Sequence, residues 1–509
     1  MKTSIYNYFT ETTQRFPGKT AVIEGDQLLT FGQLQQATYT LASELLQKDV
    51  EPGAVIAVLL KKSTRAVVAD LAITGIACVY MNLDVKSPTA RIGQILDVIL
   101  PDLVITDTQG LQLLNQIPGY DIKTVNLDSV KLFDGENRAE YLGASRLHSV
   151  IDTDPYCIIN TSGSTGVPKG VILNHRSFVD FTQWSTDTLN VNGTEIVGSL
   201  SPIVFDIFSY ELCMLACTGS TLCLIDERLS PYPAKILSIL EENRVTFIFW
   251  VPTIMVNIAN LGLLEKFGLP NLKQVWFAGE VFPTIHFNKW FDSLPRVSFV
   301  NLYGPIEITL DCTYYIVKDR ISDDQPIPIG YPCRNTALLV LNEDGTETID
   351  GKIGELYVRG TSLAMGYYNN PEQTARAFVP NPLNNNYKEL IYKTGDLVIR
   401  EGGLYYFKGR ADTMIKHLGY RIELGDVEHV ILSSLKTVRN VCVVYAPHRK
   451  EIIAYCELCE PLTLRQFRSD LTERLPAYMI PGRMVEVKQM LMNANGKIDR
   501  LHFQKLAEE

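Results

Sequence analysis

The chain has 509 residues, of which 46% are hydrophobic and 20% charged, and its net charge is −10. These numbers predict a well-packed globular protein of two to four domains or subdomains. They argue against nucleic acid or an anionic membrane as the main partner. No uninterrupted apolar run is long enough to span a bilayer and the N-terminus lacks a signal-peptide core, so we expect a soluble cytoplasmic protein.

The first three hundred residues alternate between expected strands and helices. Strands are expected at 21–23, 55–60, 77–83 and 103–105, and helices at 4–14, 30–46, 63–76 and 88–96. The same alternation of strands and helices returns between residues 177 and 300. Such alternation predicts α/β architecture with two doubly wound, mainly parallel layers.

The composition changes twice in the last third of the chain. From about Val317, short strands separated by glycine turns predict a β-rich subdomain. After Gly409-Arg-Ala-Asp412 the pattern becomes that of a compact α+β unit. We therefore expect an N-terminal core over residues 1–411 and a small C-terminal domain over 412–509.

The ten cysteines form no regular framework, which is typical of reduced, buried thiols. One C-x-x-C pair, Cys456 and Cys459, has no second pair and no histidine at ligand spacing. Alternation across Ile452–Leu458 favours a strand there over a zinc site.

The stretch from Thr161 to Val171 is rich in glycine and hydroxyl groups and lies between two short apolar segments. This pattern predicts a strand–loop–strand hairpin whose tip could cradle a polyphosphate. A solvated linker has the same composition. The candidate phosphate ligands are Thr161, Ser162, Gly163, Ser164, Thr165, Gly166 and Lys169.

A second candidate segment, Asn301–Thr309, follows an expected strand, at the edge where open α/β sheets bind ligands. The Tyr303 ring is suited to a base, the Asn301 amide to base edges and the Glu307 carboxylate to Mg²⁺. A tight Tyr-Gly-Pro turn with an exposed glutamate explains the same residues.

Two further turns carry charged groups. Asp396 and Arg410 could bind the hydroxyls of a sugar, or could be solvated charges at strand ends. Lys497 follows a glycine turn near the C-terminus, where most lysines face solvent.

Taken in order, five segments resemble the motif set of the adenylate-forming superfamily, in particular the amino-acid adenylation domains of nonribosomal peptide synthesis. The resemblance covers roughly residues 15 to 500. The segments are Thr161–Val171, Gly354–Gly360, Tyr392–Asp396, Gly409–Asp412 with Tyr420–Gly425, and Asn495–Lys497.

The resemblance implies two half-reactions: ATP and a carboxylate give an acyl-adenylate and pyrophosphate, and a thiol then takes the acyl group. It implies that Thr161–Lys169 wrap the β,γ-phosphates, Glu307 binds Mg²⁺, and Lys497 bridges the carboxylate and the nucleotide. Asn301 and Tyr303 would hold adenine, and Asp396 with Arg410 the ribose. Asp412 would be the hinge of a rotating C-terminal lid.

The sequence departs from the family pattern in two places. Ile306 replaces the usual threonine, which removes a hydroxyl contact to the α-phosphate that Thr309 could replace. Leu418 stands where multimodular synthetases carry arginine, and this is more similar to free-standing members.

The resemblance also implies a substrate pocket. Asp206 matches the aspartate that binds the α-ammonium of an amino acid, although it also suits the N-cap of the helix that follows. The rest of the expected pocket comprises Ile207, Tyr210, Phe249, Trp276, Ala278, Leu302, Leu310 and Asp311. This set resembles free-standing prolyl adenylating enzymes, which load a separate carrier protein. Asp311 is unexplained by this resemblance: it could help hold a secondary ammonium or could face solvent.

The expected activity is therefore adenylation of a small α-amino acid, with L-proline as the substrate hypothesis. ATP, Mg²⁺ and a separate phosphopantetheinylated carrier protein are the expected cofactors and partner. D-alanine activation and acid–CoA ligation are alternatives within the superfamily. A catalytically silent amino-acid or nucleotide sensor is an alternative of another class, which Ile306 favours.

Overall fold

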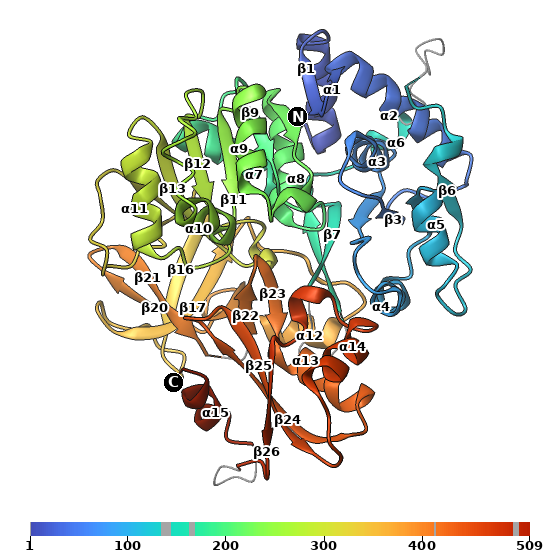
Figure 1. Ribbon diagram of the computed structural model, residues 1–509. Coiled ribbons are helices and arrows are strands. Elements are labelled where there is room, and N and C mark those ends of the chain that lie inside the picture. The colour runs from blue at the N-terminus through green and yellow to red at the C-terminus, as the bar shows by residue number, and fades with distance from the viewer. Residues whose placement is uncertain (1, 134–143, 162–167, 412–413, 492–497, 509) are drawn as a thin grey trace.

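The computed structural model describes residues 2–133, 144–161, 168–411, 414–491 and 498–508. Two large sheets with covering helices lie side by side, and the last hundred residues form a smaller unit below them in Figure 1. The prediction of an α/β fold with a large N-terminal part and a small C-terminal part is confirmed. None of the described helices is long and apolar enough to cross a bilayer.

The first sheet has a parallel centre and an antiparallel edge. Its four parallel pairings join β7 to β4, β4 to β3, β3 to β5 and β5 to β6, while β7 and β8 form an antiparallel hairpin. Its order is β18 (Gly366–Tyr367), β8 (Lys169–Asn174), β7 (Pro155–Thr161), β4 (Val79–Asn82), β3 (Val55–Leu59), β5 (Leu103–Thr106), β6 (Thr124–Asn126). The helices that accompany it are α2 (Phe31–Leu46), α3 (Thr64–Gly75), α4 (Thr89–Ile99) and α5 (Thr108–Leu114).

The second sheet is built in the same way. Its order is β15 (Tyr331–Pro332), β14 (Thr313–Val317), β13 (Ser298–Tyr303), β12 (Gln274–Phe277), β11 (Phe247–Trp250), β9 (Ile196–Ser199), β10 (Thr221–Leu224), β1 (Thr20–Glu24), β2 (Gln27–Thr30). The strands from β13 to β1 are parallel, and the outer strands are antiparallel. Its helices are α7 (His175–Leu189), α8 (Asp206–Cys213), α9 (Pro233–Glu242), α10 (Pro252–Asn260) and α11 (Thr284–Ser293).

Chain order predicted that the strand near Ala21 joins the first sheet, and this is wrong. Val22 of β1 pairs with Leu222 of β10 in the second sheet. The reason is the helix α1 (Ile5–Arg15), whose buried Ile5, Tyr6 and Phe9 belong to the hydrophobic cluster between the two sheets. The N-terminal segment therefore closes the edge of the sheet that follows later in the chain.

The predicted β-rich subdomain is an antiparallel sheet of β16 (Thr336–Leu341), β17 (Ile353–Gly360), β20 (Leu390–Glu401), β19 (Phe378–Pro380) and β21 (Leu404–Arg410). The short helix α12 (Pro371–Ala377) interrupts it, at a place where no helix was predicted. Pro371 at the first helical position and the Asn370 side chain at the N-cap explain why a helix starts there.

The C-terminal unit begins with a hairpin of β22 (Met414–His417) and β23 (Tyr420–Glu423). Its main sheet contains β24 (Val438–Ala446), β25 (Glu451–Leu458) and β26 (Arg483–Val487), with helices α13 (Leu424–Ser434), α14 (Leu464–Thr472) and α15 (Arg500–Glu508). The strand expected across Ile452–Leu458 is confirmed as part of β25.

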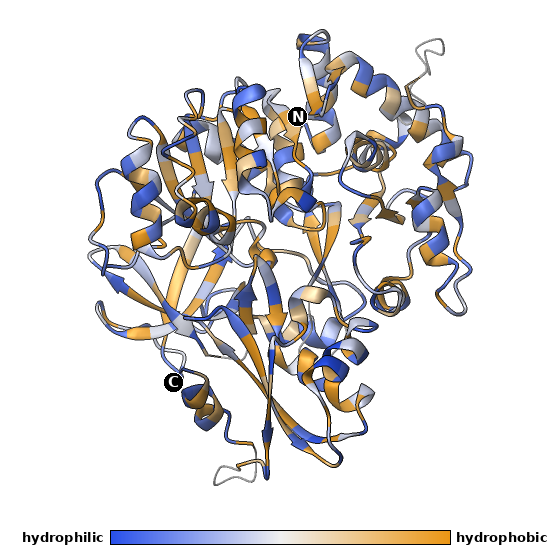
Figure 2. Ribbon diagram, in the orientation of Figure 1, coloured by the Kyte–Doolittle hydropathy of each residue, from blue (hydrophilic) through white to orange (hydrophobic). Residues whose placement is uncertain are grey.

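Apolar residues concentrate in the strands and on the inner faces of the helices, as Figure 2 shows. The two hydrophobic clusters around Ile422–Ile480 and Cys442–Ala507 are separate from the clusters of the two large sheets. The boundary between 411 and 412 stays a prediction, since 412 and 413 lie outside the described residues.

Candidate active site

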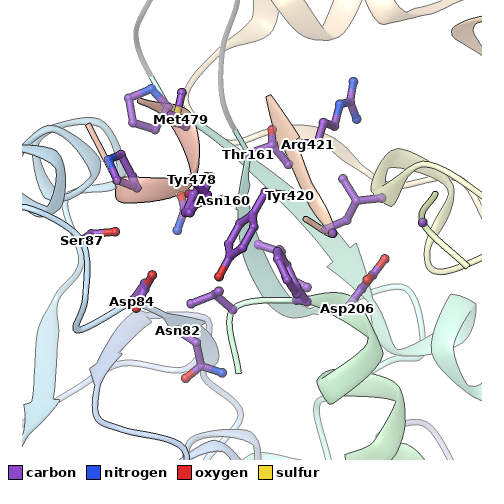
Figure 3. A pocket seen from close by; sticks show the side chains of 18 of the residues that line it. Asn82, Asp84, Ser87, Asn160, Thr161, Asp206, Tyr420, Arg421, Tyr478 and Met479 are labelled. Carbon is purple, nitrogen blue, oxygen red and sulfur yellow. The ribbon is translucent and has the colours of Figure 1, made fainter. Parts of the chain in front are cut away.

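A cavity of about 170 Å³ lies where the carboxyl ends of the two large sheets meet the C-terminal unit. Asn82 and Thr161 end strands of the first sheet, and Gly279 and Gly304 follow strands of the second. Ligand sites in open α/β sheets lie at such carboxyl ends. The C-terminal unit contributes Lys416, Gly419, Tyr420, Arg421, Pro476, Tyr478 and Met479. In Figure 3 the Tyr420 ring lies between Asp84 and Asp206.

Asp206 is on the wall of this cavity, as the first residue of α8. It is not the N-cap, which is Phe205, and its Oδ1 accepts a hydrogen bond of 2.9 Å from the Ile207 backbone N–H. Burial raises the pKa of the Asp206 carboxyl to about 6, while that N–H and the nearby Lys416 ammonium act to lower it. The Asp206 carboxyl group can therefore be ionised near neutral pH and can bind a cationic ligand.

The residues predicted for adenine and ribose form one polar group beside the cavity. The buried Asp396 accepts hydrogen bonds from the Tyr303 hydroxyl and the Arg410 guanidinium, and Arg410 also faces Asp396 across the β20–β21 pair. Asn301 donates from its side-chain amide to the backbone oxygen of Pro328 at 2.7 Å. The structure thus brings Tyr303, Asp396 and Arg410 together, while their nucleotide roles stay predictions.

Glu307, the predicted Mg²⁺ ligand, is 1% exposed. Its Oε1 accepts a hydrogen bond of 2.7 Å from the Tyr367 hydroxyl, and its Oε2 pairs with Arg421 of the C-terminal hairpin. Burial acts to raise the pKa of Glu307, yet Arg421 and Tyr367 together lower it. Because a guanidinium already neutralises this carboxylate, the described arrangement does not fit a Mg²⁺ ion.

Lys169, at the base of the predicted phosphate loop, lies close to the same group. Thr161 and Lys169 pair across the antiparallel β7–β8 hairpin, which confirms the strand–loop–strand prediction. The Lys169 ammonium is 5.4 Å from the centre of the Tyr367 ring. The Lys169 ammonium therefore lies near Tyr367, whose hydroxyl donates to Glu307.

Thr309 and Leu310 have unusual backbone conformations. Their φ angles are +52° and +64°, in the left-handed region that non-glycine residues seldom occupy. The buried Thr309 Oγ1 has no hydrogen-bond partner among the described residues. Strained backbone next to an unsatisfied hydroxyl is typical of functional sites, and Ile306 lines the cavity beside it.

The predicted side-chain pocket is assembled as one aromatic group. Tyr210, Phe249 and Trp276 are fully buried, and the Tyr210 and Trp276 rings stack with centres 5.9 Å apart. The Tyr210 hydroxyl donates to Ser185 Oγ at 2.8 Å. One hydrophobic cluster contains these rings together with Ile207, Ala278, Leu302 and Leu310.

Asp311 has no role that follows from the sequence alone, and no motif marks Lys416 as a site residue. Asp311 is 4% exposed, so a solvent-facing position is excluded. Lys416 lines the cavity, with its ammonium 5.6 Å from the centre of the Tyr303 ring. Lys416 lies in β22, where no strand was predicted, and it has no local signal of this role because only the packing of the hairpin brings it into the cavity.

Several predicted residues lie outside the described residues: Ser162, Gly163, Ser164, Thr165, Gly166, Asp412 and Lys497. The described neighbours of Lys497 belong to the C-terminal unit. The Asp499 backbone N–H donates to the Leu491 oxygen at 2.8 Å, and Ile498 packs against the cluster of Cys442 and Phe503.

Comparison with known proteins agrees with this geometry. The AMP-binding enzyme family matches residues 9–368. The chain is 32% identical to zwittermicin A synthase ZmaJ of Bacillus cereus, over 98% of this chain and 94% of that protein. It is 31% identical to tyrocidine synthase 1 of Brevibacillus parabrevis, over 98% of this chain but only 44% of that longer protein.

Among solved structures, the fold matches that of the Vibrio cholerae adenylation domain AlmE in complex with glycyl-adenosine-5'-phosphate. The TM-score is 0.84 at 21% identity, covering 100% of this chain and 98% of that one. The chain belongs to the AMP-binding enzyme family and is an AMP-forming adenylating ligase, of the type that nonribosomal peptide synthetases use for ATP-dependent amino-acid activation.

Proposed function

We propose that the chain adenylates a small α-amino acid, with L-proline as the preferred substrate, and transfers it to the phosphopantetheine thiol of a separate carrier protein. The observation that carries this proposal is Asp206, a carboxylate on the wall of a cavity at the carboxyl ends of the sheets. It supplies a counter-charge for an α-ammonium, which a fatty or aryl acid lacks.

In the first half-reaction, an oxygen of the amino-acid carboxylate attacks the α-phosphorus of ATP, and the bond from that phosphorus to the pyrophosphate oxygen breaks. Negative charge grows around phosphorus in this step, so cations beside it lower the barrier. Lys169 and Lys497 are the proposed sources, with Lys497 delivered by a different orientation of the C-terminal unit. Binding of Mg²⁺ at Glu307 would need Arg421 to withdraw from that carboxylate.

The nucleotide would bind beside the Tyr303 group. Asp396 and Arg410 are proposed to hold the ribose hydroxyls, after partial exchange of their present hydrogen bonds. Within the described part of the chain, the Asn301 side chain makes only the bond to Pro328, so its carbonyl oxygen and second N–H are proposed to bind the adenine edge. Thr309 is proposed to replace the threonine hydroxyl missing at Ile306.

A small substrate is supported by the bulk of the predicted side-chain pocket. Tyr210, Phe249 and Trp276 are buried and pack on one another, and Tyr210 belongs to the same helix as Asp206. The relative AlmE is described with a glycyl adenylate, which also supports a small amino acid. The near-equal length of ZmaJ supports a carrier on another polypeptide.

ATP–pyrophosphate exchange across the twenty amino acids, both enantiomers of proline and D-alanine tests the proposal. We expect L-proline to give the highest kcat/KM. Equal or faster exchange with alanine, valine or phenylalanine would remove proline but keep the activity class. Binding of ATP without exchange for any amino acid would favour the sensor, and thioester formation on coenzyme A with a plain acid would favour an acid–CoA ligase.

A further inference from the structure

The chain segment that leads into Asp206 lies outside regular secondary structure. It covers residues 200–205, between the end of β9 at Ser199 and the start of α8. Backbone carbonyls in such a buried segment must find hydrogen-bond partners other than a helix or a sheet. In and beside this segment, the carbonyls of Ser199, Ser201 and Ile203 accept hydrogen bonds from side chains that come from the first sheet.

Lys62, which follows the end of β3, binds two of these carbonyls. Its ammonium donates to the backbone oxygen of Ser199 and, at 2.9 Å, to that of Ser201. The same ammonium lies 5.9 Å from the centre of the Phe208 ring, within the range of a cation–π contact. A cation from the first sheet therefore contacts both the end of β9 and the helix that carries Asp206.

Asn82, the last residue of β4, binds the third carbonyl. Its side-chain amide donates to the Ile203 oxygen at 3.2 Å and to Asp70 Oδ2 at 3.0 Å. Asn82 also lines the cavity (Figure 3). Alternate carbonyls at positions 199, 201 and 203 are thus bound from the first sheet, and a shift of the segment that ends at Asp206 would break these bonds.

The counter-charge of Lys62 is on α8 itself. Glu211 is fully buried, and its Oε2 accepts a hydrogen bond from the hydroxyl of Ser199, the residue whose backbone oxygen binds Lys62. Burial lowers the pKa of Lys62 and raises the pKa of Glu211, and each of the two groups counteracts this effect in the other. The two charges therefore stabilise each other across Ser199.

Two neutral hydrogen bonds attach the same helix to its neighbours. The Tyr80 hydroxyl donates to Ser209 Oγ at 2.9 Å, and the Tyr210 hydroxyl donates to Ser185 Oγ at 2.8 Å. Neither bond involves Lys62. We therefore expect α8 to form when the lysine is replaced, with its first turn less firmly placed.

We propose that Lys62 is a positioning residue of the amino-acid site, which fixes the β9–α8 segment so that the Asp206 carboxylate stands at the cavity wall, and that Glu211 is its counter-ion. The inference rests on the proposed function, because it takes Asp206 as the group that binds the α-ammonium. It does not depend on which amino acid is used. A residue that acts through Asp206 should lose its influence when Asp206 loses its charge.

Pyrophosphate exchange, measured with varied amino acid and separately with varied ATP, tests this assignment. The variants are Lys62→Met, Lys62→Arg, the charge-neutral pair Lys62→Met/Glu211→Gln, Asp206→Asn, and Lys62→Met/Asp206→Asn. The neighbouring Lys61 is exposed and donates to Gln109, so Lys61→Met is the matched control. Urea unfolding of each variant reports whether it still folds cooperatively.

Misplacement of a binding group by about 1 Å can cost up to about 100-fold in rate. We expect the amino-acid KM to rise about tenfold in Lys62→Met and in the charge-neutral pair, while the KM for ATP stays within about twofold. Lys62→Arg should recover most of this loss, because it keeps a charged donor. In the Asp206→Asn background, Lys62→Met should raise the amino-acid KM by less than about twofold. Lys61→Met should behave as the wild type.

An unchanged amino-acid KM in the charge-neutral pair would overturn the inference. So would an equal rise of the KM for ATP and for the amino acid, or an equal effect of Lys62→Met with and without the Asp206 charge, since both indicate a purely structural role. Loss of cooperative unfolding in Lys62→Met and in the charge-neutral pair would show that the fold itself needs Lys62, which also contradicts it. Absence of exchange by the wild type with every amino acid would instead refute the proposed function.

Discussion

Replacing Asp206 by asparagine is the most direct test of the amino-acid site. The side-chain oxygen of the new amide can still accept the 2.9 Å hydrogen bond from the Ile207 N–H, so α8 should start unchanged. The variant loses only the negative charge that faces the α-ammonium. A charge-assisted hydrogen bond contributes about 1.5–3 kcal/mol, which predicts a rise in amino-acid KM of roughly ten- to hundredfold.

The pH profile adds a second readout. Burial raises the pKa of Asp206 to about 6, so a proton competes with the substrate ammonium for the carboxylate below that pH. Amino-acid affinity of the wild type should therefore fall by about fivefold between pH 6 and pH 5, and should be nearly constant above pH 7. In Asp206→Asn this dependence should disappear, because the amide does not titrate.

The assay is pyrophosphate exchange with varied amino acid at saturating ATP, from pH 5 to pH 8. The KM for ATP serves as an internal control and should change little, and the exposed Asp319→Asn variant controls for loss of surface charge. An unchanged amino-acid KM in Asp206→Asn would refute the reasoning. A wild-type KM that falls as the solution becomes more acidic would refute it equally.

Three further predictions concern the scaffold. Burial raises the pKa of Asp70 to about 8, so the folded state keeps a proton that the unfolded chain loses above its ordinary pKa, and wild-type stability should fall as pH rises toward 8. Asp70→Asn should remove this loss, on the order of 1 kcal/mol per pH unit, because an amide does not titrate. The new amide can also donate to Asn82 Oδ1, which has no hydrogen-bond partner among the described residues. Urea unfolding at pH 5 and pH 8 measures the effect, and an equal pH dependence of the unfolding free energy in both proteins would contradict it. Arg91→Met should remove the ion-pair partner of Asp426, which lies 3.1 Å away and whose side chain is 0% exposed. The attachment of α13 should weaken by about 3–5 kcal/mol. Faster amide hydrogen exchange over Leu424–Ser434 would show this, and unchanged exchange would show that the pair contributes little. Trp276→Ala, at a fully buried position, should enlarge the amino-acid pocket and lower the stability of the fold by about 3–5 kcal/mol. Pyrophosphate exchange with phenylalanine should then increase relative to exchange with proline. An unaltered preference would place the side-chain pocket elsewhere.

The sequence by itself predicted the α/β class, the hairpin that ends at Thr161 and Lys169, and the family. Hydrophobic periodicity and turn residues are local signals that can be read from the sequence. The family follows from several motifs in a fixed order, although each motif alone is a weak signal. For the same reason Asp206 could be proposed as a site residue: it lies at the start of an expected helix, in a segment that matches the family.

Only the tertiary structure decided how distant segments combine. Arg421 reaches Glu307 across 114 positions of sequence, β1 pairs with the later sheet, and Lys416 enters the cavity from the C-terminal hairpin. Asp311 could not be distinguished from a surface carboxylate until its burial was known. Ion pairs and burial depend on which elements pack together, and that is set by the summed apolar contacts of the whole chain, which no local pattern contains.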